Sequence, residues 1–210
     1  MIKLDRLVRS AGASLGESLN YYWPPTNLNA QALERNISLH MAHAFRAAGH
    51  LVYGEVNSAH PAGSTARFDL LAVDPATSGY TIAEFKRMDD MGQAQGFVAD
   101  WNRIVGFVPQ PAGAHRHQLL DLNQKWGVLA AITSNVEIAR WFNTLNEDQG
   151  DPWTVGEENG PLDAAWADCW EALYTGNTLY LDAVPLADWH EVRHNQRASY
   201  WLVYVIAKLP

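Results

Sequence analysis

The chain has 210 residues, of which 48% are hydrophobic, and a formal net charge of −8 at pH 7. This length and composition predict one globular domain with a substantial apolar core, and no apolar stretch is long enough to cross a membrane or resembles a signal peptide. Because Cys169 is the single cysteine, the sequence excludes an internal disulfide framework and a cysteine-based metal site, and a cytoplasmic location is expected.

The first predicted helix carries one acidic side chain beside its buried stripe. Thr26 or Asn27 is a suitable N-cap and Gly49 a suitable C-terminal stop. Between them apolar residues recur at helical spacing, and Glu34 borders that stripe. A solvated glutamate is the ordinary interpretation of Glu34, and Arg35 next to it can face either phosphate or water.

Two apolar runs, at 68–73 and 80–85, predict a pair of strands joined by a short turn-forming segment. So short a connection predicts antiparallel neighbours. Asp69 interrupts the first run, and Glu84 and Lys86 lie at the end of the second. Since side chains alternate along a strand, Glu84 and Lys86 share one face, and Asp69 joins them if its face coincides with theirs.

Two carboxylates and a lysine at one point are suited to metal-dependent phosphodiester hydrolysis. Magnesium prefers oxygen ligands and keeps several waters, so two carboxylates suffice to bind it. The ion lowers the pKa of its water and neutralises charge on the phosphate, and a lysine can stabilise the transition state. The ordinary alternative is a solvated ion pair at a strand end, but an unpaired charge inside an apolar run is costly and favours a functional interpretation.

The rest of the chain predicts further α/β structure. Asp89 or Asp90 can cap a helix that runs to about Val105. Beyond it, the apolar patterns predict a buried strand at 126–133, a helix capped by Ser134 or Asn135 that ends near Phe142, and a late core strand at 200–207.

In this order, the helix with Glu34, a strand at 51–56, the strand with Asp69 and the strand ending in Glu84-Phe85-Lys86 resemble the PD-(D/E)XK nuclease superfamily. The resemblance covers residues 28–142 as a nuclease-like core. It departs from the family pattern before Asp69, where Phe68 stands in place of the proline. The fold that the resemblance implies is an α/β domain with a mixed central sheet flanked by helices, which is the restriction-endonuclease-like core.

The resemblance also implies roles for individual residues. Asp69, Glu84 and the backbone carbonyl of Phe85 would bind Mg²⁺, for which Mn²⁺ is a substitute. Lys86 would position or activate the attacking water, and Glu34 would bind through water or hold a second metal.

Other polar residues are expected to lie near the substrate. Gln93, near the start of the next helix, resembles the polar residue that relatives often carry there, and a solvated glutamine is the equal alternative. The substrate is expected to be DNA rather than RNA, and four arginines are candidates for contacts with it: Arg35, Arg67, Arg87 and Arg103.

The negative charge is concentrated late in the chain. Residues 137–191 hold twelve acidic residues and one basic residue, whereas the remainder has fourteen bases and eleven acids. We therefore interpret residues 143–199 as an acidic, tryptophan-rich insertion or C-terminal elaboration of a single domain, and residues 143–191 as a candidate surface for a protein partner. The alternative function is a binding module on a nuclease fold that acts through this segment without cleavage.

Overall fold

The computed structural model describes residues 2–21, 30–57, 67–77, 79–88, 93–107, 124–144, 179–191 and 196–209. In these ranges six strands form one mixed sheet in the order β1-β2-β3-β4-β6-β5, and four helices accompany it, so the expected α/β class is confirmed. The elements are α1 (Ile2–Tyr21), α2 (Ala30–Ala47), β1 (Leu51–Asn57), β2 (Arg67–Asp74), β3 (Gly79–Arg87), α3 (Ala94–Val105), β4 (Lys125–Thr133), α4 (Val136–Thr144), β5 (Leu179–Glu191) and β6 (Gln196–Lys208).

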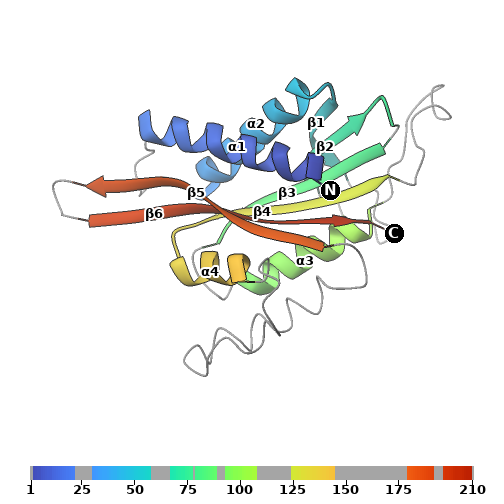
Figure 1. Cartoon of the computed structure of the whole chain (residues 1–210). Coiled ribbons are helices and arrows are strands. Elements are labelled where there is room, and N and C mark those ends of the chain that lie inside the picture. Colours follow the sequence, from blue (N-terminus) through green and yellow to red (C-terminus); the bar gives the residue numbers. More distant parts are fainter. Residues whose placement is uncertain are drawn as a thin grey trace.

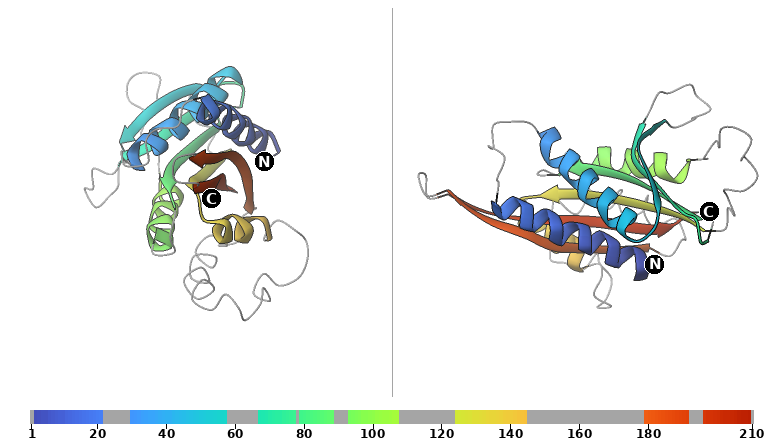
Figure 2. Two further views of the ribbon diagram at one scale, coloured as in Figure 1. Left: turned by 90° about the vertical axis from the view of Figure 1, so that its left-hand side faces the viewer. Right: turned by 90° about the horizontal axis from the view of Figure 1, so that it is seen from above.

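Helices cover both faces of the sheet. Helices α1 and α2 lie on one face, and α3 and α4 lie on the other (Figures 1 and 2). Each face has its own apolar core: Ile37, Met41 and Phe45 of α2 pack on the first face, and Phe97 and Trp101 of α3 pack on the second. No helix in the described ranges is long and apolar enough to cross a membrane.

Strand β4 is one of the two central strands, with β3, and it pairs in parallel with β3 and antiparallel with β6. Its residues 127–133 are buried, as expected for a strand covered by helices on both faces. A parallel pair needs a crossover connection, and α3 lies in the connection between β3 and β4. All other strand pairs are antiparallel, including the predicted pair β2 and β3.

Helix α1 is an element for which the sequence analysis made no prediction. Leu4, Val8 and Leu15 form its buried stripe at helical spacing. Gly16 lies directly against β5, since a Cβ added there would be 2.3 Å from the carbonyl oxygen of Leu186. The helix therefore needs a small residue at this crossing.

A polar network ties α1 to the two C-terminal strands. Arg9 forms ion pairs with Asp5 of its own helix and with the buried carboxylate of Asp182 on β5. Tyr204 of β6 donates a hydrogen bond to Asp5 Oδ1 at 2.6 Å, and Tyr180 donates one to Asp182 Oδ2 at 3.1 Å. Asp182 is therefore a buried acid whose charge is compensated inside the fold.

Several predicted boundaries differ from the structure. Helix α3 begins at Ala94, with Gln93 at the N-cap and no side-chain capping hydrogen bond, so it starts later than a cap at Asp89 or Asp90 predicts. Those two residues lie outside the described ranges. The predicted cap of α4 is confirmed at Asn135, whose Oδ1 accepts the N–H of Glu137 at 2.9 Å.

The acidic segment contributes to the main sheet. Strand β5 belongs to the predicted elaboration at 143–199, yet it pairs with β6 along its length and forms one edge of the sheet. The predicted late core strand at 200–207 is part of β6, which begins earlier, at Gln196. Residues 145–178, which include Cys169 and most of the segment assigned to a protein partner, lie outside the described ranges.

Candidate active site

The predicted acidic pair lies where β2 and β3 cease to pair. The ladder between these strands ends with Leu70 opposite Ala83, and Asp69 follows one residue beyond. There the Asp69 side chain, and not a backbone carbonyl, accepts the hydrogen bond from β3: its Oδ2 accepts the N–H of Phe85 at 2.7 Å. This bond holds Asp69 beside the backbone of Phe85 and next to the side chain of Glu84.

Glu84 is buried among charged groups on the face covered by α3. Only 2% of the residue is exposed. Burial raises the pKa of Glu84 to about 8, and Asp69 contributes by charge repulsion and by accepting a hydrogen bond from the protonated form, while Arg103 opposes the rise. The ionised form of the Glu84 carboxylate is therefore disfavoured, and a cation bound beside it would offset the free-energy cost of ionising a buried acid.

Lys86 lies on the same face, two residues further along β3. Its Nζ is 3.1 Å from Oδ2 of Asp100 on α3. Burial lowers the pKa of Lys86, but Asp100, Glu84 and Glu34 together more than offset burial, and the net pKa is raised. Lys86 is therefore a cation at neutral pH, suited to contacting an anionic group rather than to accepting a proton.

Helix α3 supplies two charged residues that complete the cluster. Arg103 forms an ion pair with Glu84 and a second one with Asp100, at 2.8 Å between Nη2 and Oδ1. The guanidinium also lies over the ring of Phe68, with Cζ 5.7 Å from the ring centroid. Glu84, Lys86, Asp100 and Arg103 thus form an alternating chain of charges between β3 and α3.

Asp100 is the site residue that the sequence analysis missed. It is 6% exposed, although it belongs to a helix whose outer face is polar. A signal was present: Asp100 follows Phe97 by three residues and precedes Ile104 by four, which places an acid on the buried stripe of the helix. An acid at such a position needs a cationic partner, and here it has two.

Glu34 approaches the same end of the sheet from the other helical layer. Its Oε1 accepts the backbone N–H of Arg87 at 3.0 Å. Its charge also contributes to raising the pKa of Lys86. The structure therefore brings Glu34, on α2, to the end of β3 that carries Lys86.

The other predicted residues are Gln93, Arg35, Arg87 and Arg67, which differ in exposure and in their place in the fold. Gln93 is exposed at the N-cap of α3, seven residues before Asp100 and thus about 10 Å away along the helix axis. Arg35 is exposed on α2, and Arg87 is half-buried at the end of β3. Arg67 has a side chain that is 63% exposed and pairs with Glu55 at 3.2 Å.

The oxygen donors of this cluster come mainly from Asp69 and Glu84. In the described ranges no three side chains of His, Cys, Asp or Glu converge as a ready-made metal group. Asp69 and Glu84 are adjacent carboxylates, however, and Mg²⁺ binds through one or two carboxylates while it retains water. An adjacent pair of carboxylates, with Glu84 buried and Asp69 half-buried, therefore fits a hydrated magnesium ion.

Comparison of the chain with protein-family models, with curated proteins and with solved structures gave no match.

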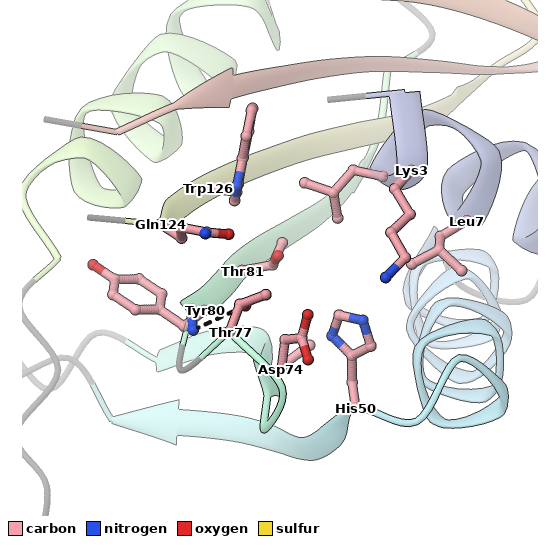
Figure 3. Close-up of a pocket in the computed structure, with 12 residues that line it drawn as sticks. Lys3, Leu7, His50, Asp74, Thr77, Tyr80, Thr81, Gln124 and Trp126 are labelled. Carbon is pink, nitrogen blue, oxygen red and sulfur yellow. Dashed lines mark hydrogen bonds between the residues drawn. The ribbon is translucent and has the colours of Figure 1, made fainter. Parts of the chain in front are cut away.

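A separate cavity of about 190 Å³ opens at the other end of the β2–β3 hairpin. Figure 3 shows His50 between Asp74 and Lys3, with Trp126 further along the cavity wall. Asp74 is five residues from Asp69 along β2, which is roughly 16 Å. Asp74 is the one acid among the lining residues, so this cavity lacks the paired carboxylates of the candidate active site.

Proposed function

We propose that this protein is a magnesium-dependent nuclease that hydrolyses phosphodiester bonds, with DNA as the preferred substrate. The observation that carries the proposal is the adjacency of Asp69 and Glu84, with Glu84 buried and Lys86 on the same face. The order of elements, from the helix bearing Glu34 to the strand ending in Lys86, supports it through its resemblance to the PD-(D/E)XK superfamily. A cytoplasmic location belongs to the same proposal.

In this proposal each residue has a stated task. Asp69 and Glu84 hold the ion, which when bound supplies a water of lowered pKa and neutralises phosphate charge. Lys86 carries its positive charge toward the scissile phosphate and stabilises the charge that develops in the transition state. Glu34, on α2 across the sheet from α3, orders water at the end of β3. The exposed Arg35 and Arg67, with Arg87, contact the nucleic-acid backbone.

The net charge of −8 sets a limit on how the substrate binds. Nucleic-acid affinity depends on neutralised phosphates, and twelve of the acidic residues fall within residues 137–191, late in the sequence. We therefore expect weak binding to free duplex that decreases steeply with salt. A nearly flat salt dependence would speak against phosphate contacts by these arginines.

The test is cleavage of plasmid, linear duplex, single-stranded DNA and RNA, each with Mg²⁺, with Mn²⁺ and with a chelator. We expect metal-dependent cleavage of DNA that falls by at least about a hundredfold in Asp69→Asn and in Lys86→Met. Glu137→Gln is the matched control, because Glu137 pairs with Arg140 on the surface of α4 and should leave the rate unchanged. Cleavage that persists in Asp69→Asn or in chelator would refute the proposal.

The second candidate is a nuclease-fold binding module without catalysis. It is favoured by one observation: Glu84 and Asp100 already have cationic partners within the protein. The two candidates are separated by magnesium titration of the wild-type protein. A module predicts no metal binding and no cleavage, together with binding to a protein partner through residues 143–191.

A further inference from the structure

The ion pair between Arg103 and Glu84 has a consequence for any cation that binds at Glu84. A guanidinium and a divalent metal both neutralise a carboxylate, and one buried oxygen pair has little room for both partners. Arg103 lies on α3, on the same side of the sheet as the Glu84 carboxylate, and contacts its Oε1. The unliganded protein thus contains its own counter-ion at the position where the proposed metal would act.

Arg103 is also held by groups that do not belong to the acidic pair. Asp100 Oδ1 is 2.8 Å from its Nη2, and the ring of Phe68 lies beneath the guanidinium. If Glu84 turns away, Arg103 keeps a buried carboxylate partner and does not become an unpaired buried charge. Arg103 can therefore lose its ion pair with Glu84 while α3 stays folded.

We propose that Arg103 is the determinant of metal affinity at this site: it competes directly with the divalent cation for Glu84, and Asp100 retains it when the cation binds. The inference rests on the proposed function only in taking Asp69 and Glu84 as metal ligands. It makes Arg103 part of the metal centre rather than a contact for nucleic acid, the role for which the sequence suggested it.

Lys86 allows direct competition between Arg103 and the metal for Glu84 to be distinguished from general repulsion of the metal by nearby positive charge. It is a second cation in the cluster, but its ion pair is with Asp100. Removing either cation makes the local potential more negative. Removing Arg103 alone also frees Glu84 from a direct partner, so the two substitutions should differ.

The experiment is calorimetric titration of Mg²⁺ and of Mn²⁺ into substrate-free protein. We expect Arg103→Met to bind Mn²⁺ about tenfold to a hundredfold more tightly than wild type, since a hydrogen bond to a charged group no longer opposes binding. Lys86→Met should gain at most a few-fold, and Asp100→Asn should bind more weakly, because Arg103 then depends more on Glu84. Arg103→Gln, which keeps a polar side chain, is measured beside Arg103→Met in case the latter does not fold.

The outcomes separate this inference from the proposed function. Metal binding by wild type with no gain in either folded Arg103 variant, or with an equal gain in Lys86→Met, overturns the inference and leaves the proposed metal site intact. Binding that is seen only after Arg103 is replaced supports the inference. An absence of binding in every folded variant overturns both.

Discussion

Replacement of Glu84 by glutamine should change how the stability of the protein depends on pH. The pKa of Glu84 is raised from 4.5 to about 8 by burial and by Asp69. A group with a raised pKa binds its proton more tightly in the folded state, so its contribution to stability is complete below pH 4.5 and is lost as the pH rises through 8. At 1.36 kcal/mol per pKa unit, the loss amounts to about 5 kcal/mol, a large part of the stability of a typical domain. Glutamine has no proton to lose, and the variant should lack this decline.

The assay is urea unfolding of both proteins at intervals from pH 4.5 to 9, with a chelator present throughout. All other titrating groups are shared, so the difference between the two free energies of unfolding isolates Glu84. This difference should move by about 5 kcal/mol in favour of the variant as the pH rises. Parallel pH profiles for wild type and Glu84→Gln would show that the carboxyl titrates as an exposed group, and that burial beside Asp69 does not raise the pKa of Glu84.

Further predictions concern the packing of α1. Gly16→Ala should lower the free energy of unfolding by about 3 kcal/mol, because the new Cβ would clash with the backbone of Leu186 and neither backbone can move aside. The control is Gly96→Ala, whose new Cβ would have open space around it. This variant should be neutral or more stable than wild type by about 0.5–1 kcal/mol. An equal effect of the two alanines in urea unfolding would contradict the close approach. Tyr204→Phe should cost about 2 kcal/mol by removing the hydrogen bond to the Asp5 carboxylate, and a cost below about 0.5 kcal/mol would mean that water replaces this bond.

The β2–β3 pair and its acids could be predicted from the sequence because all the signals are local. Alternation places Glu84 and Lys86 on one face, a short turn makes the strands antiparallel, and the structure has the hairpin in this form. The face of Asp69 was conditional at the sequence level. It is fixed by a bond to the backbone of Phe85, sixteen residues away, which no local pattern contains.

Ion-pair partners that come from distant elements could not be predicted from local sequence patterns. Asp100 was passed over because apolar periodicity describes where a helix is buried and does not say which charges of another element it meets. Arg103 was interpreted as a contact for nucleic acid, whereas the structure pairs it with Glu84 and Asp100. Helix α1 was not predicted although its apolar residues recur at helical spacing, because glycines such as Gly16 are poor helix formers and the reason for a small residue there is the crossing with β5.

The network that joins α1 to the last two strands has a consequence for the order of folding. Arg9 and Asp182 are 173 residues apart in sequence, and Asp5 and Tyr204 are 199 apart. Helix α1 also packs against α2, so part of its apolar stripe can be buried by a segment close in sequence, but Arg9 and Asp5 gain these polar partners only when β5 and β6 have joined the sheet. Contacts between segments so far apart in sequence raise the contact order and slow folding, so we expect the polar attachment of α1 to the C-terminal strands to form late.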